Sequence, residues 1–93
     1  MRSALPPILF PTSEAIGVKQ AAARTGKSIT TIRRLVAERE LGRQTFRGAP
    51  VEICWPALLM AVHGDPEAIE LLRDGNRSDP RVKRYLDYAA AYG

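Results

Sequence analysis

One stretch of the chain, TGKSITTIRRLVAEREL (residues 25–41), predicts a tight turn followed by a helix with two unlike faces. Gly26 is suited to end a preceding helix as its C-cap. Ser28 is suited to cap the next helix, because its hydroxyl can accept a hydrogen bond from a free backbone N–H. Apolar residues recur at helical spacing on one side: Ile29, Ile32, Leu35 and Val36. The opposite side carries Thr30, Arg33, Arg34 and Ala37, with Thr31 at the boundary.

Further elements are predicted on both sides of this stretch. Before it, the alanine-rich residues 18–25 favour a short helix. After it the period changes, and residues 43–46 and 51–54 are typical of two strands joined by a turn at 47–50. A further apolar helix is expected at 56–62, with a proline in its first turn. The candidates for the core side of the strands are Phe46, Val51 and Ile53.

The N-terminal segment, residues 1–14, is rich in proline and predicts a flexible arm. It is expected to be mobile unless its apolar side chains dock on the domain. These side chains are Leu5, Ile8, Leu9 and Phe10.

The C-terminal region, residues 65–93, predicts a helical extension. An amphipathic helix is expected at 66–73 and a second helix at 81–92, with Asp79 as N-cap and Pro80 in the first position. The second helix has an apolar stripe and a tyrosine stripe, which are Val82, Leu86 and Ala89, and Tyr85, Tyr88 and Tyr92. The tyrosines are expected to cover the core with their hydroxyls in water, to contact a neighbouring copy, or to do both.

Positive charge is concentrated in one segment. Residues 19–47 contain eight basic and two acidic residues, whereas the rest of the chain contains six basic and eight acidic ones. A localised excess of this kind is the electrostatic footprint expected for a polyanionic partner.

Composition narrows the class of protein. Ninety-three residues suffice for one small domain with a modest core. The lone Cys54 excludes an internal disulfide, and the N-terminus has neither a signal peptide nor a membrane span. We therefore expect a cytoplasmic protein without a membrane partner.

The order of these elements is that of a winged helix-turn-helix, with a two-stranded wing at residues 43–54. The stretch GVKQAAARTGKSITTIRRLVAEREL and the following hairpin resemble the MerR-like and excisionase-like families over roughly residues 16–63. The matching positions are Val18, Ala22, Gly26, Ser28, Thr31, Ile32, Leu35, Val36 and Leu41, with Arg47 and Gly48 in the wing. The expected fold is thus α+β and mostly helical, with a winged helix-turn-helix domain at 15–64 and the C-terminal helical extension at 65–93.

The resemblance also implies which residues contact DNA. Members of these families place the second helix in the major groove and the wing against the flanking minor groove. The implied contacts are Lys27, Ser28, Thr30, Thr31, Arg33 and Arg34 from the helix region, and Arg43, Arg47 and Gly48 from the wing. The sequence departs from the family pattern at Lys27, where an apolar residue is usual, and at Arg39-Glu40, where a glycine is common.

Small basic members of this group are similar to excisionases, which are also called recombination directionality factors. The resemblance implies a nucleoid-associated protein of a bacterium or phage. We expect it to bind double-stranded DNA cooperatively near an attachment site and to help an integrase (a tyrosine recombinase) to excise a mobile element. The alternatives are a small transcriptional regulator of a phage or mobile element, the DNA-recognition domain of a terminase small subunit, and a protein-interaction module.

An enzymatic function is not expected, and no cofactor or metal is implied. His63 has no nearby cysteine or second histidine and is expected to end an apolar helix. Cys54 is expected to be a small buried hydrophobe on a strand. Trp55 is expected to pack between the wing and a helix.

Overall fold

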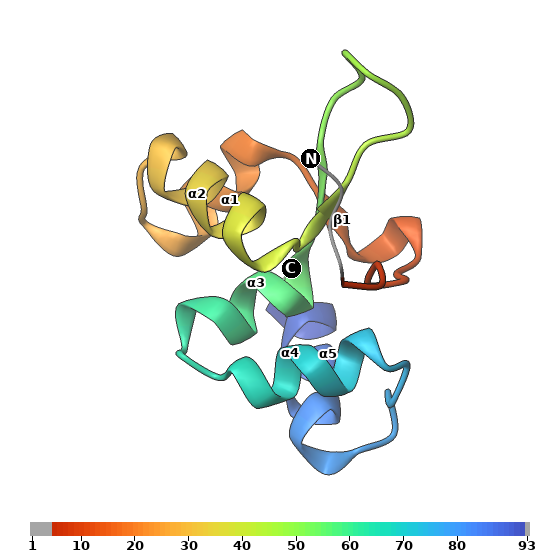
Figure 1. Cartoon of the computed structure of the whole chain (residues 1–93). Coiled ribbons are helices and arrows are strands. Elements are labelled where there is room, and N and C mark those ends of the chain that lie inside the picture. The colour runs from red at the N-terminus through yellow and green to blue at the C-terminus, as the bar shows by residue number, and fades with distance from the viewer. Residues whose placement is uncertain (1–4, 93) are drawn as a thin grey trace.

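The computed structural model describes residues 5–92, which form helices packed around a small antiparallel sheet (Figure 1). The α-helices are α1 (Val18–Thr25), α2 (Ile29–Arg39), α3 (Trp55–Val62), α4 (Pro66–Arg73) and α5 (Pro80–Tyr92), and a 3-10 turn, η1 (Thr12–Glu14), precedes the first strand. The prediction of a mostly helical α+β fold is confirmed, and every predicted helix is present.

The ends of α1 and α2 follow from local chemistry. Gly26 ends α1 in the left-handed conformation with φ of 71°, as the sequence predicts. The Ser28 side chain accepts a hydrogen bond from the backbone N–H of Thr31 and so caps α2. Glu40 ends α2 with φ of 55°, which makes it the only non-glycine residue between 5 and 92 with a positive φ. This conformation costs about 1–2 kcal/mol for an L-residue.

The sheet has three strands, β1 (Ala15–Ile16), β2 (Gly42–Arg43) and β3 (Glu52–Cys54), in the order β1-β3-β2. Both neighbours of β3 run antiparallel to it, and Ile53 pairs with Ile16 on one side and with Gly42 on the other. The sequence did not predict β1. A Cβ at Gly42 would lie 3.0 Å from the Glu52 carbonyl oxygen and 3.1 Å from Val36, so this strand approaches α2 as only glycine allows.

The two predicted hairpin strands are shorter in the structure than in the prediction. Residues 44–51 form a loop, and the predicted core positions Phe46 and Val51 are 67% and 37% exposed. Ile53, by contrast, is fully buried, as predicted. The alternation of inward and outward side chains stops where the ladder stops, so residues beyond Arg43 have no sheet face to occupy.

The buried apolar residues form one continuous core that runs from Ile8 to Ala89. Helix α3 lies at its centre, and its residues from Trp55 to Met60 are all buried. Helices α4 and α5 pack against α3 through Ile69, Leu72 and Val82. Residues 65–92 are therefore part of the same packed body as the predicted DNA-binding domain at 15–64.

The predicted flexible arm needs correction for its described part, residues 5–14. Ile8 and Phe10 are buried in the common core, because alternate residues of this extended segment face inward. The bond from Arg73 Nη1 to the Pro6 carbonyl (2.9 Å) and the bidentate ion pair from Arg77 to Glu14 (2.9 Å to each oxygen) fasten the segment to α4 and the following loop. Residues 1–4 and Gly93 lie outside the described part of the chain.

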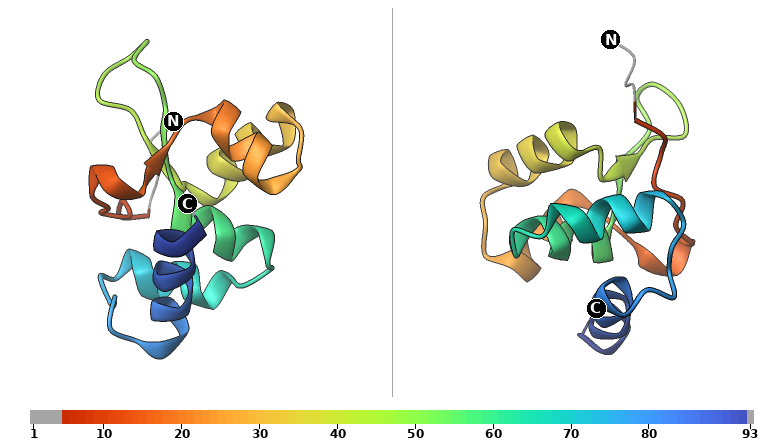
Figure 2. Two further views of the ribbon diagram at one scale, coloured as in Figure 1. Left: turned by 180° about the vertical axis from the view of Figure 1, so that it is seen from behind. Right: turned by 60° about the horizontal axis from the view of Figure 1, so that its bottom comes forward.

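The arrangement in space separates two ends of the molecule. The loop between β2 and β3 projects from the body beside α2, at the end opposite to α4 and α5 (Figure 1). The view from behind in Figure 2 shows the same separation. The predicted DNA-contacting segments and the tyrosine-bearing helix therefore lie on different parts of the surface.

Candidate functional site

The outward face of α2 is built as the sequence predicts. Ile32 is fully buried on the inner face of α2, whereas Thr30, Arg33 and Arg34 are exposed on the opposite face. Thr31 is half-buried at the edge. Hydroxyl and guanidinium groups thus share one exposed face of a helix whose other face is anchored in the core.

The N-terminus of α2 uses part of this polar set for capping. Ser28 Oγ accepts a hydrogen bond from the Thr31 N–H (3.1 Å) and donates one to Thr31 Oγ1 (3.0 Å). The Thr31 hydroxyl keeps its own proton for a donor bond to another group. Lys27 is exposed just before the cap, and its backbone N–H donates to Thr25 Oγ1 (3.3 Å). Lysine fits the turn at this position because its side chain faces solvent.

The cations on this side of the molecule are largely uncompensated. Within residues 19–47, six exposed basic side chains form no ion pair with a carboxylate of residues 5–92, namely Lys19, Lys27, Arg33, Arg34, Arg39 and Arg47. The ion pairs that the structure contains involve Arg43, Arg73, Arg77, Arg81 and Lys83. A positive potential over α1, α2 and the β2–β3 loop follows from this distribution.

Arg43 differs from the other predicted DNA contacts, because its guanidinium is engaged inside the protein. Its Nε bonds Glu52 Oε1 at 2.9 Å, and its Nη1 donates to the Phe10 carbonyl at 2.6 Å. The same guanidinium lies 4.2 Å from the centre of the Phe10 ring. Arg43 therefore joins β2 to β3 and to the N-terminal segment. The structure removes it from the group of unpaired cations.

An apolar groove of about 700 Å³ lies between α2, the start of α1 and the β2–β3 loop. Arg33 and Lys19 stand on its lining, with Val18, Ile29, Val36 and Val51 among the apolar residues. Ile29 was predicted on the buried face of α2 but is 40% exposed here. The groove brings α2 and the base of the loop to one surface, which the sequence pattern did not reveal.

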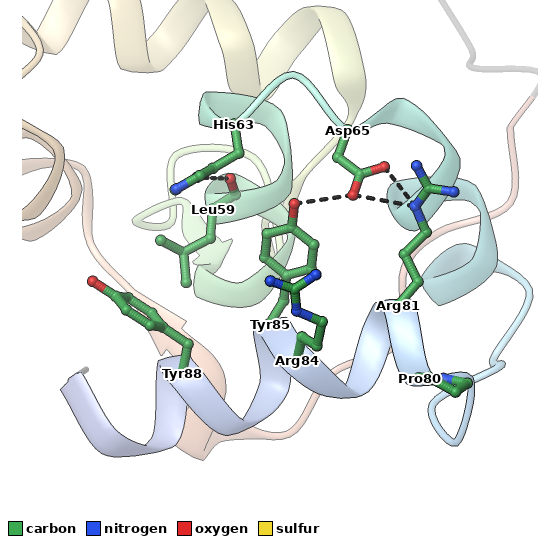
Figure 3. Close-up of a pocket in the computed structure, with 8 residues that line it drawn as sticks. All are labelled: Leu59, His63, Asp65, Pro80, Arg81, Arg84, Tyr85 and Tyr88. Carbon is green, nitrogen blue, oxygen red and sulfur yellow. Dashed lines mark hydrogen bonds and ion pairs between the residues drawn. The ribbon is translucent and has the colours of Figure 1, made fainter.

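A second surface lies around α5, where the three predicted tyrosines do not behave alike. Figure 3 draws two of them, Tyr85 and Tyr88. Tyr85 is half-buried and donates from its hydroxyl to Asp65 Oδ2 at 3.0 Å. Tyr88 and Tyr92 are 51% and 72% exposed, and their rings lie 4.7 Å apart. Only this exposed pair is free to meet another molecule, whereas Tyr85 belongs to the internal structure.

Asp65 holds the region around Tyr85 together. Its carboxylate caps α4 through the Ala68 N–H (3.2 Å) and accepts from Arg81 Nε (3.1 Å) as well as from Tyr85. Burial by itself would raise the pKa of the Asp65 carboxyl, but the hydrogen bonds from Ala68, Tyr85 and Arg81 outweigh it and lower the pKa below 3.8. His63, at the end of α3 as predicted, bonds the Leu59 carbonyl through Nδ1 (2.9 Å) beside this cluster.

Cys54 and Trp55, which were considered as candidates for chemistry, both lie in the packed interior. Cys54 is fully buried on β3, as predicted, and burial raises the pKa of its thiol to about 12. Trp55 is buried at the start of α3, with the Arg24 guanidinium 5.2 Å from its ring centre. No three His, Cys, Asp or Glu side chains in the described chain gather in a way that could hold a metal ion.

Comparison of the chain with protein-family models, with curated proteins and with solved structures gives no match. None of the helices between residues 5 and 92 combines the length and the apolar character that crossing a membrane requires. The unpaired basic face of α2 and the β2–β3 loop is therefore the feature of this molecule from which a function can be argued.

Proposed function

We propose that this protein is a winged helix-turn-helix DNA-binding protein that acts as an excisionase. In this proposal α2 enters the major groove and the β2–β3 loop is the wing, which lies along the flanking minor groove. The observation that carries the proposal is the exposed face of Thr30, Arg33 and Arg34 on a helix whose other side is buried. Guanidinium groups bond guanine edges and phosphates in two-pronged geometry, and no carboxylate of residues 5–92 occupies these two arginines.

The position of the unpaired cations supports binding to a duplex rather than to a small anion. Lys19 on α1, Lys27 and Arg34 near α2, and Arg47 on the loop belong to three separate elements. A spread of single positive charges over a projecting surface fits the spaced phosphates of a nucleic-acid backbone. In an enclosed site for a small anion, several hydrogen-bond donors instead point at one position.

Binding in several copies completes the proposal. A domain of this size buries only about 600–1,000 Å² on DNA, which is little for tight specific binding. The exposed pair Tyr88 and Tyr92 lies on α5 and supplies an aromatic surface for a neighbouring copy. Adjacent copies on DNA would assist a tyrosine recombinase in excision of a mobile element.

The test is a gel-shift titration with DNA from the region around the gene and its nearest attachment site. The wild-type protein is compared with an Arg33→Ala, Arg34→Ala double variant and with a matched control, Lys83→Ala, whose side chain is exposed on α5. A ladder of shifted bands that only the double variant loses supports the proposal. The absence of binding to every fragment at low salt would overturn it.

An excision assay then separates the proposed role from the main alternative. Purified integrase and a plasmid with both attachment sites should yield excised circles only when this protein is added. Binding confined to a promoter fragment, together with an unchanged excision yield, would instead make the protein a small transcriptional regulator.

A further inference from the structure

Phe46 is a large apolar side chain that is unusually exposed to solvent. It is 67% exposed, whereas the other phenylalanine, Phe10, is 7% exposed in the core. An exposed apolar residue is not by itself informative. The surroundings of Phe46 are informative, because it lies on a hydrogen-bonded turn within the β2–β3 loop. This loop projects from the body of the protein (Figure 1).

The turn that presents Phe46 is closed by two hydrogen bonds. The Ala49 N–H donates to the Phe46 carbonyl (3.0 Å), and Gln44 Nε2 donates to the Ala49 carbonyl (2.6 Å). Gly48 supplies the positive φ, 91°, that the third position of such a turn requires. The exposed aromatic ring is thus carried by a backbone of defined shape. Less conformational freedom is lost when such a loop binds.

The charge around the ring matches a polyanion. Residues 41–51 contain two arginines and no acidic residue. Arg43 is engaged with Glu52 and Phe10, so Arg47, which directly follows Phe46, is the cation of the loop available to a partner. The apolar groove is lined by Arg33 of α2 and by Ala49 and Pro50 of the loop, so Arg33 and the end of the turn border one surface.

We propose that Phe46 is a wedge that inserts between adjacent base pairs from the minor groove and kinks the duplex. The inference rests on the proposed function, because it requires the protein to bind DNA. Arg47 contacts the neighbouring phosphates while the ring partly unstacks one base step. Apolar wedges of this kind kink DNA by about 20–90°, and the bent duplex then contacts more of the protein. In this way a small domain gains contact area that a straight duplex would not offer.

The experiment uses a short duplex obtained by selection from random DNA with the wild-type protein, labelled in two ways. A 2-aminopurine placed at successive base steps reports unstacking by a rise in fluorescence, and a donor and acceptor at the two ends report bending. The variants are Phe46→Ala, which removes the wedge, and Phe46→Leu, which keeps a shorter one. Leu9→Ala is the matched control, since Leu9 is 77% exposed on a different segment. Circular dichroism melts verify that each variant is folded.

Wild-type protein is expected to raise the fluorescence at one base step and to shorten the distance between the duplex ends. Phe46→Ala should lose both signals and bind about tenfold more weakly, as expected when one base–aromatic contact is removed. Phe46→Leu should keep part of both signals, and Leu9→Ala should behave as wild type.

Different results overturn the wedge and the proposed function. Tight binding by the wild type without unstacking or bending overturns the wedge alone, as does a Phe46→Ala variant that bends DNA fully. Self-association without DNA that depends on Phe46 also overturns it and assigns the ring to an interface between copies. Failure of the wild type to bind any DNA overturns the wedge together with the proposed function.

Discussion

Arg73 of α4 donates from Nη2 to the backbone carbonyl of Arg39, 2.8 Å away, at the last turn of α2. The carbonyls at the end of a helix lack partners within the helix and carry partial negative charge, so a buried guanidinium is well placed there. The same group reaches the Pro6 carbonyl of the N-terminal segment (2.9 Å). One side chain thereby connects the N-terminal segment, the proposed recognition helix and the C-terminal helices.

Replacement of Arg73 by Met is expected to lower the free energy of unfolding by about 2–4 kcal/mol. The apolar stem is kept, but the carbonyls of Pro6 and Arg39 lose the donor that the buried guanidinium supplies. The control is Arg84→Met on α5, which removes an exposed guanidinium without an ion pair among residues 5–92 and should change stability by no more than about 0.5 kcal/mol. Urea denaturation measures both. Equal effects of the two changes would show that the buried bonds do not stabilise the fold.

Gly42→Ala is expected to destabilise the protein by about 1–3 kcal/mol, since a Cβ there meets a backbone carbonyl oxygen at 3.0 Å and Val36 at 3.1 Å. The backbone of β3 cannot rotate away as a long side chain could. Gly17→Ser adds a Cβ where no atom lies within 4 Å, and it places a capping hydroxyl before α1. Thermal melts should therefore separate the two glycine variants, and a Gly42→Ala variant as stable as wild type would contradict the close approach.

Asp65 should make stability depend on pH in the acid range. Because hydrogen bonds lower the pKa of its carboxyl in the folded state, the stabilisation is fully present above the ordinary value of 3.8 and is lost as the pH falls below it. Asp65→Asn keeps a capping side chain but loses the charge, so it should be less stable than wild type at pH 7. The difference between the two proteins should shrink as the pH falls below about 4. A difference that stays constant in denaturation curves from pH 7 to pH 3 would contradict this role.

The two arginines of the β2–β3 hairpin should give opposite results. Arg47→Ala is expected to leave the melting temperature unchanged, to weaken binding to all DNA sequences alike and to lower the slope of log K against log salt by about one. Arg43→Ala should lower the melting temperature, because Glu52 and the Phe10 carbonyl lose their partner. Fluorescence anisotropy over a range of salt concentrations, with melts of the same samples, measures both. An unchanged salt slope in Arg47→Ala would place the loop away from the phosphates.

Replacement of Tyr88 and Tyr92 together by Ala tests the proposed contact between copies. The double variant should bind a single site as the wild type does but lose cooperativity on DNA with several sites, since both rings are exposed and contribute little to the core. Tyr85→Phe is the matched control, because it alters an internal hydrogen bond to Asp65 rather than the exposed pair. Cooperative binding by the double variant in a gel-shift titration would assign the contact to another surface.

The features that sequence could predict are those set by neighbouring residues. The caps at Gly26, Ser28 and Asp79 follow from the chemistry of one or two residues, and all three are found. The exposed face of α2 follows from the helical spacing of its apolar residues. These predictions succeed because the chemistry that decides them is local.

The features that sequence missed depend on contacts between distant segments. Strand β1 pairs with β3, and the paired residues Ala15 and Cys54 are separated by 38 residues of the chain. A strand of two residues is also too short to show a periodicity of its own. The buried side chain of Arg73 bonds the carbonyls of Arg39 and Pro6, which lie 34 and 67 positions away in the chain. One local signal was present, because Arg73 follows the buried Ile69 by four positions and so shares its helix face. The loss of Arg43 from the basic face likewise required knowledge of where Phe10 docks.

Because Cys54 is buried, the reactivity of its thiol reports on conformational opening of the protein. It is the only cysteine, and it lies where β1, β3 and α3 meet, with a thiol that burial keeps protonated. The thiolate is the nucleophile that attacks a thiol reagent, so the reagent can modify only molecules in which this junction has opened and exposed Cys54. The rate of modification under native conditions therefore measures the opening equilibrium without an added label. Any ligand that binds the closed form should slow that rate in proportion to its occupancy.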